Sequence, residues 1–204
     1  MFSKRNRTPS EYIGYCLYLY FLGLSLRNVV KALSYLHIVK RSHVAIWKWI
    51  QKFQYQRKSS IKEKQVSEYI VDETSLKAGS DLVWLWVALE PENKQILAQN
   101  ITQERNMIVA ERFLSGVVRD YGKHPVSTDG GTWYPMACQF LKLKHHVHSP
   151  LEKSMIERKI QYIKDRTESF DDYFPCMLKN CKLKHMINWL NLFVEYHNKE
   201  MIYA

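Results

Sequence analysis

Three acidic residues have the types and the spacing of a divalent-cation site. Asp72 and Asp129 each follow a short uncharged run that is predicted to be a strand, and Glu157 lies within the amphipathic segment 149–170. A carboxylate at the end of a buried strand is held rigidly at the edge of a sheet. Two strand ends and one helix can therefore converge on a pair of ions, an arrangement that cleaves and rejoins phosphodiester bonds. The three acids predict metal-dependent chemistry on phosphodiesters.

The composition favours a catalytic domain joined to a small basic module. The chain has 204 residues, of which 46% are hydrophobic, and a net charge of +10. Residues 1–66 contain 13 Lys and Arg against two acidic residues, a net charge of +11, whereas residues 67–204 have a net charge of −1. A basic unit beside a near-neutral remainder predicts a module that binds a polyanion, and a solvated basic surface is the alternative.

The cysteines and the apolar segments indicate a cytoplasmic protein with no membrane partner. Four cysteines are scattered through the chain, which does not resemble a disulfide framework. The apolar stretch 12–26 is shorter than a membrane-spanning helix, and no signal-peptide pattern opens the chain.

Residues 1–53 predict an all-α domain of three helices. The first covers about 11–22, Ser25 caps the second, and Ser42 caps the third. The third helix has apolar residues at every third position (Val44, Trp47, Ile50 and Phe53) and polar residues on its other face (His43, Lys48, Gln51 and Lys52). A short link before it is typical of a helix-turn-helix, whose last helix enters the major groove of DNA. We therefore predict DNA contacts for the four polar residues, and a bundle that only packs on its neighbour is the alternative.

The remaining residues predict an α/β domain over 66–204, after a polar linker at 54–65. Strands are predicted near 67–72, 82–90, 95–102 and 125–128, and the second of them is apolar on both faces, as in a central strand. A helix over 106–121 separates the last two strands, with five residues facing the core (Ile108, Ala110, Phe113, Leu114 and Val117). This element order is that of the ribonuclease-H-like fold, in which the first and fourth strands are neighbours and their carboxylates meet.

The helix that carries Glu157 has a well-marked start. Ser149 and Glu152 form a capping box, and a proline occupies the first helical position. Lys164 follows Glu157 by seven residues and therefore shares its face, and Arg158 adds positive charge beside it. The helix is predicted to present an acid for a metal and a cation for phosphate.

Three motifs together resemble the DDE transposases of prokaryotic insertion sequences, in particular insertion-sequence family six and its compact archaeal members. They are Val71-Asp72-Glu73-Thr74, Ser127-Thr128-Asp129-Gly130, and Glu157 followed by Lys164. The resemblance covers the chain from the predicted helix-turn-helix to about Phe193. One departure is the 27 residues between Asp129 and Glu157, fewer than is usual for the family, which indicates a shortened connection through 141–148.

The resemblance implies an integrase-type, ribonuclease-H-like catalytic domain. In such a domain Asp72, Asp129 and Glu157 are the catalytic ligands of two Mg²⁺ (or Mn²⁺) ions, and Lys164 contacts DNA near the scissile phosphate. The implied partners are double-stranded DNA, both the terminal inverted repeats and the target, and further copies of the chain. The implied reaction is nicking by water followed by attack of the freed 3′-hydroxyl on target DNA. A ribonuclease-H-like nuclease without strand transfer and a catalytically silent repressor are the alternatives.

Three further features are open to two interpretations. Glu73 either supports the metal ligands or faces solvent. A zinc site at Cys176, Cys181 and His185, completed by one histidine among His145, His146 and His148, competes with buried thiols and a surface histidine. Trp133 and Tyr134 either stack on an unpaired base or belong to the core, and the core is favoured.

Overall fold

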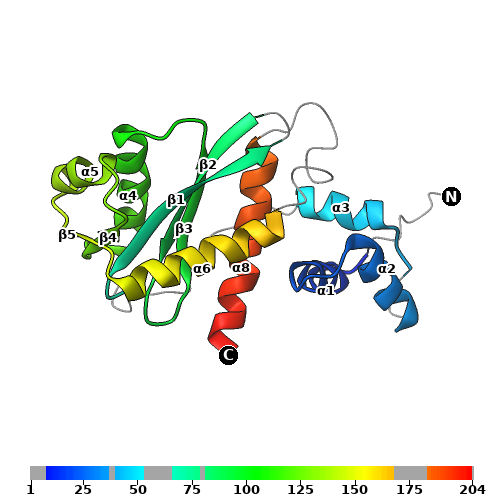
Figure 1. The fold of residues 1–204 in the computed structure, drawn as a ribbon. Helices are drawn as coiled ribbons and strands as arrows, with labels where there is room; N and C mark the ends of the chain where they lie inside the picture. Colours follow the sequence, from blue (N-terminus) through cyan, green and yellow to red (C-terminus); the bar gives the residue numbers. More distant parts are fainter. Residues whose placement is uncertain (1–7, 37–39, 53–65, 79–80, 168–182, 204) are drawn as a thin grey trace. The chain divides into compact units, whose positions relative to one another are not determined.

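The computed structural model describes residues 8–36, 40–52, 66–78, 81–167 and 183–203. They belong to two compact units, Met1–Tyr55 and Gln56–Ala204, which are considered separately below (Figure 1). The predicted linker at 54–65 and the two cysteines of the predicted zinc site, Cys176 and Cys181, lie outside the described residues. Among the described helices, none is long and apolar enough to cross a membrane.

The first unit contains the three predicted helices, α1 (Ser10–Phe21), α2 (Leu26–Tyr35) and α3 (His43–Lys52). Both predicted caps are confirmed. The Ser25 hydroxyl accepts a hydrogen bond from the Asn28 amide at 3.2 Å, and the Ser42 hydroxyl accepts one from the Ala45 amide at 3.3 Å. These bonds satisfy amides that have no partner within the first turn of a helix.

The buried face of α3 differs from the predicted one. Ile46 and Ile50 are fully buried, whereas Val44 is 45% exposed and Trp47 is only partly buried. Positions four residues apart lie on one side of a helix, while a repeat of three residues drifts around it. The core of the unit is therefore formed by Ile46 and Ile50, which are four residues apart. The fourth predicted apolar residue, Phe53, lies outside the described residues.

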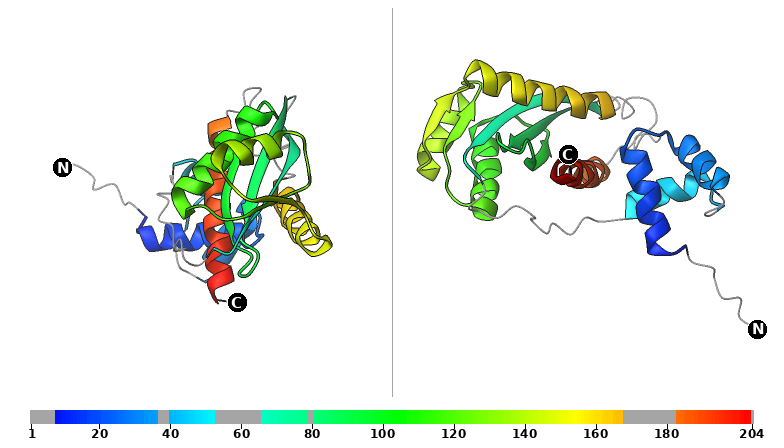
Figure 2. Two further views of the ribbon diagram at one scale, coloured as in Figure 1. Left: turned by 90° about the vertical axis from the view of Figure 1, so that its left-hand side faces the viewer. Right: turned by 90° about the horizontal axis from the view of Figure 1, so that it is seen from below.

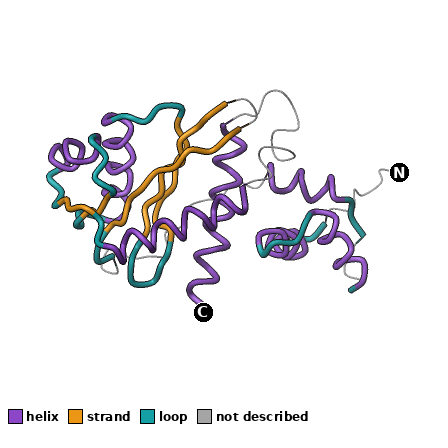
Figure 3. The backbone as a smooth tube through the Cα atoms, in the orientation of Figure 1, coloured by secondary structure: helices purple, strands orange, loops and turns teal. Residues whose placement is uncertain are grey.

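The second unit is built on a five-stranded mixed sheet (Figures 1 and 3). Its strands are β1 (Tyr69–Ala78), β2 (Asp81–Leu89), β3 (Ile96–Thr102), β4 (Val126–Thr128) and β5 (His145–Val147). Their order is β3-β2-β1-β4-β5, with antiparallel pairing of β1, β2 and β3 and parallel pairing of β1, β4 and β5. The first and fourth strands are neighbours, as predicted. The fifth strand was not predicted.

The prediction that Asp72 ends its strand was wrong. β1 continues to Ala78 because its far half pairs with β2, where Asp72 lies opposite Val87. The pairing between β1 and β4 nevertheless stops early, at Tyr69 with Val126 and Ile70 with Ser127. Asp72 therefore lies just beyond the parallel part of the sheet, where β4 has ended.

Helices cover both faces of this sheet. Figure 2 shows α4 (Met107–Tyr121) and α5 (Trp133–Leu141) on one side and α6 (Pro150–Thr167) on the other. The predicted inner face of α4 is confirmed at four of its five positions, and Ile108 is the exception with 54% exposure. Ile108 lies in the first turn of α4, directly after the Asn106 cap, which accepts a hydrogen bond from the Val109 amide at 3.0 Å.

The last helix, α8 (Leu183–Tyr203), lies along the edge strand β3. The Asn198 side chain accepts a hydrogen bond from the Ile96 amide at 2.9 Å and donates one to the Ile96 carbonyl at 2.8 Å. Asn198 thus provides the donor and the acceptor that a neighbouring strand would provide. Its contacts protect an otherwise unpaired sheet edge.

Candidate active site

The structure brings Asp72 and Asp129 together at the end of the parallel pairing. One carboxylate oxygen from each of Asp72, Glu73 and Asp129 lies within 4.8 Å of the others. Continuing the register of β1 and β4 by two residues sets Asp72 beside Asp129, so the sheet itself positions the pair. Each carboxylate is also oriented locally. Asp72 accepts a hydrogen bond from the Glu73 amide at 2.8 Å, and Asp129 accepts one from the Gly131 amide at 2.9 Å.

This concentration of negative charge suits a divalent cation. Burial raises the pKa of Asp72 to about 7, and the neighbouring charges of Glu73, Asp129 and Glu157 act in the same direction. Carboxylate oxygens are the ligands that Mg²⁺ and Mn²⁺ prefer in proteins. A bound cation would offset the repulsion among these carboxylates. The residues present therefore fit the metal that the resemblance implies.

Glu157 approaches the pair from α6. The predicted capping box is confirmed, because the Ser149 amide donates to Glu152 at 2.6 Å and the Glu152 amide donates to the Ser149 hydroxyl at 3.3 Å. The predicted stripe of Ile156, Ile160 and Ile163 is buried, and α6 packs against β1. Both features fix the helix over the strand that carries Asp72.

The Glu157 side chain remains outside the group formed by Asp72, Glu73 and Asp129. It is 59% exposed and lies 3.9 Å from the ammonium of Lys153. Its charge contributes to the raised pKa of Asp72, so the carboxylate is near the pair without joining it. The three predicted ligands are thus gathered in one region, with Glu157 the most loosely held.

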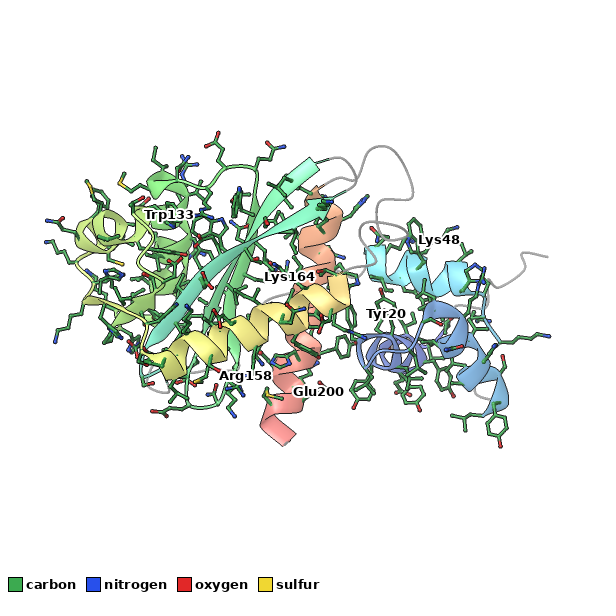
Figure 4. All side chains as sticks on the ribbon, viewed as in Figure 1. Tyr20, Lys48, Trp133, Arg158, Lys164 and Glu200 are labelled. Atoms are coloured by element: carbon green, nitrogen blue, oxygen red, sulfur yellow. The ribbon has the colours of Figure 1, made fainter. Side chains whose placement is uncertain are left out.

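The predicted DNA-binding residues lie on two helices. On α6, Arg158 is exposed and Lys164 is partly buried (Figure 4). The Arg158 guanidinium bonds the Ser154 carbonyl at 3.1 Å and the Ser154 hydroxyl at 2.8 Å. On α3, His43, Lys48 and Lys52 are exposed and Gln51 is partly buried.

Glu73 supports the site and does not face solvent. Its side chain is 2% exposed, it accepts a hydrogen bond from the Tyr134 hydroxyl, and one of its oxygens lies 3.3 Å from Nε of Arg105. Burial raises the pKa of Glu73, while the Tyr134 hydrogen bond and the charge of Arg105 oppose that shift. Tyr134 is fully buried, which confirms its place in the core. The sequence reasoning missed Arg105, because nothing local marks it as the partner of Glu73.

A second cluster, also missed, fastens the start of α6 to the sheet. Nε2 of His146 lies 3.2 Å from a carboxylate oxygen of Glu68 and 3.2 Å from one of Glu152. The other two histidine candidates for the predicted zinc site form hydrogen bonds with residues of strand β4. His145 pairs with the Thr128 hydroxyl at 2.8 Å, and His148 pairs with the Ser127 hydroxyl at 2.7 Å.

Gly131 offers a test of how tightly the Asp129 loop is held. A Cβ atom at this position would lie 2.7 Å from the Trp133 ring, and the Gly131 amide bonds Asp129. We expect Gly131→Ala to destabilise the protein by about 1–3 kcal/mol and to lower metal-dependent activity by displacing Asp129.

Gly116→Ala is the matched control, because no atom lies within 4 Å of that Cβ in helix α4. It is expected to stabilise the protein by up to about 1 kcal/mol. Urea denaturation of both variants measures the difference, and equal effects would contradict the expected clash.

Comparison with known proteins identifies the class of this chain. The family model of the DDE domain of IS240-type transposases matches residues 66–176. The region contains the whole sheet, with Asp72, Asp129 and Glu157. The chain therefore belongs to the DDE transposase family. The uncharacterized protein MJ0017 of Methanocaldococcus jannaschii is 29% identical over 199 residues, which are 96% of this chain and 89% of that protein.

A solved structure agrees with the fold. The intasome of simian T-cell lymphotropic virus, in complex with a regulatory subunit of PP2A, contains a chain with a TM-score of 0.50 and 14% identity. The match covers 78% of this chain and 66% of the viral chain, so about a third of that chain has no counterpart here. The magnesium-bound catalytic core of HTLV-2 integrase gives a TM-score of 0.46 and 16% identity, over 60% of this chain and 82% of that chain. The predicted ribonuclease-H-like, integrase-type fold is confirmed.

Proposed function

We propose that this chain is an insertion-sequence transposase that binds the terminal inverted repeats of its element and transfers them to target DNA. The observation that carries this proposal is the meeting of Asp72 and Asp129 carboxylates within 4.8 Å in a DDE-family domain. Acidic residues alone are common on protein surfaces. Here the pair arises from two neighbouring parallel strands, which hold the two carboxylates against their mutual repulsion.

The catalytic assignment follows from the placement of the three acids. Asp72, Asp129 and Glu157 are proposed to hold two Mg²⁺ or Mn²⁺ ions. Such a pair of ions activates the attacking oxygen and stabilises the leaving oxygen of a phosphodiester. Asp72 and Asp129 are fixed by the sheet, and Glu157 is free to adjust because its side chain is exposed. Water in the first step and a DNA 3′-hydroxyl in the second would each attack a phosphodiester beside these carboxylates, with the 3′ oxygen of the cleaved strand as the leaving group.

The DNA contacts are proposed for α6 and α3. Lys164 and Arg158 lie on the helix that carries Glu157, where their charges suit the phosphates on either side of the scissile bond. The exposed His43, Lys48 and Lys52 of α3, with Gln51, suit a helix that reads a DNA groove. The net charge of +11 on residues 1–66 supports this role.

The proposed reaction also calls for more than one copy of the chain. A transposase must hold two element ends at once before it joins them to a target. One chain offers a single pair of strand-held aspartates among its described residues. We therefore propose that the active form is a homo-oligomer assembled on DNA.

A strand-transfer assay tests the function. The purified chain is incubated with Mg²⁺, a labelled duplex that carries the terminal repeat flanking its gene, and a supercoiled target plasmid. The expected product is a covalent joint between the labelled 3′ end and the plasmid, absent with EDTA and absent with Asp129→Asn. Nicking without joining would point to a nuclease, and binding without either reaction would point to a repressor.

A further inference from the structure

Arg105 has an unusual environment beside the acidic pair. It lies in the segment between β3 and α4, and its guanidinium carbon is 4.4 Å from the ring centre of Trp84 and 4.0 Å from that of Trp133. The guanidinium is therefore stacked between two indoles. Its Nε is 3.3 Å from the buried carboxylate of Glu73, whose other oxygen is held by the Tyr134 hydroxyl. These contacts fix the orientation of a cation that would otherwise sample many rotamers.

The terminal nitrogens of Arg105 are not used by these contacts. A guanidinium has five N–H donors, and only the one on Nε points to Glu73. The structure gives the two terminal nitrogens no hydrogen bond to any residue it describes, and the side chain is 34% exposed. A side chain that served packing alone would not need to keep a third of its surface in solvent. The free end suits an anion that arrives from outside.

The position of this free end indicates which anion. One oxygen of Glu73 lies within 4.8 Å of oxygens of both Asp72 and Asp129, and Glu73 also pairs with Arg105. The cation is thus separated from the acidic pair by a single side chain. A fixed, planar guanidinium matches two oxygens of a phosphate at once, which a lysine ammonium does not. In a site for phosphodiesters, the phosphate beside the reacting one is the anion within reach.

We propose that Arg105 binds a non-reacting phosphate of the DNA strand held at Asp72 and Asp129, and so sets the position of that strand. This inference rests on the proposed function for its substrate class. Trp84 and Trp133 keep the guanidinium planar and oriented, and Glu73 prevents it from folding onto the acidic pair. Trp133 then has a defined role as one of the two rings that hold the Arg105 guanidinium, in place of stacking on an unpaired base.

Neutral phosphate substitution tests the proposal directly. The full chain with Asp129→Asn, which is expected not to cleave, is titrated with terminal-repeat duplexes that each carry one methylphosphonate near the cleavage position. One substituted phosphate is expected to weaken binding about 10-fold, the loss of one charge-assisted contact. Adding Arg105→Gln should weaken binding of unmodified DNA by about the same factor. In this double variant the methylphosphonate at that one phosphate should no longer weaken binding. It should also reduce the slope of log K against log salt by about 1.

Three further measurements separate this role from a structural one. Arg119→Gln on α4 is the matched control, because Arg119 is 77% exposed and pairs only with Asp120 among the contacts the structure gives, and it should change neither quantity. Arg105→Lys keeps the positive charge but loses the planar guanidinium that bonds two phosphate oxygens. Compared with Arg105→Gln, it should recover only part of the DNA affinity. Thermal melts show whether each variant remains folded. The proposal is wrong if the methylphosphonate weakens binding of the Arg105 variants as much as it weakens binding of the Asp129→Asn chain. It is also wrong if no methylphosphonate weakens binding of the Asp129→Asn chain. The scan needs no cleavage, so failure of strand transfer in the separate joining assay would count against the function and leave the Arg105 result standing.

Discussion

Replacing Asp72 with Asn is expected to lower the rates of DNA cleavage and joining by at least about 1,000-fold, since metal stabilisation of the transition state supplies several kcal/mol. The same substitution should make the metal-free protein more stable. Burial and the neighbouring acids raise the pKa of Asp72 to about 7, so its charged form is disfavoured in the folded state. A neutral amide of equal size removes this cost, which is on the order of 3–4 kcal/mol at neutral pH and above for a pKa raised from 3.8 to about 7.

The two effects are measured by single-turnover cleavage with Mg²⁺ and by urea denaturation in EDTA. Asp165→Asn serves as the control, because Asp165 is an exposed acid on α6 outside the group of Asp72, Glu73 and Asp129 and should alter neither quantity. A loss of activity together with a loss of stability would indicate that Asp72 acts by holding the sheet together. That result would contradict its assignment as a metal ligand.

Replacing Glu157 with Gln is expected to lower joining at least about 100-fold, as loss of one charged ligand to the metals costs about 3 kcal/mol or more. Stability should remain unchanged within about 0.5 kcal/mol, because an exposed ion pair such as the one with Lys153 contributes little. This combination differs from the one expected for Asp72, whose replacement changes both activity and stability. The difference follows because Glu157 is exposed and Asp72 is partly buried.

Asp165→Asn is the matched control for Glu157. Asp165 is an exposed acid on the same helix, and it accepts a hydrogen bond from Gln161 at 2.6 Å. It should leave both joining and the melting temperature unaltered. Full activity of Glu157→Gln would remove Glu157 from the site and point to Glu73 as the third carboxylate, since Glu73 already lies with Asp72 and Asp129.

Features that depend on a few neighbouring residues were predictable. The start of α6 is an example, because Ser149 and Glu152 satisfy each other within four residues of chain. The order of strands along the chain was also predictable, and the ribonuclease-H-like fold that it matches places Asp72 and Asp129 on adjacent strands. The ends of the strands were less predictable from the sequence. β1 runs past Asp72 because β2 pairs with it, and β5 exists because β4 offers an edge to three residues that carry no strand pattern of their own.

The sequence by itself determined that this chain is a DDE-type protein with a basic first unit, since short motifs, capping residues and charge distribution are all local properties. The tertiary structure alone decided what surrounds the acids. Glu73 meets Tyr134 across 61 residues of chain, and Arg105 reaches the same carboxylate from between two tryptophans of other segments. Such contacts arise from packing between distant segments, which no spacing along the chain records. For the same physical reason, only the tertiary structure distinguishes the partly buried Asp72 from the exposed Glu157, two acids that look alike in the sequence.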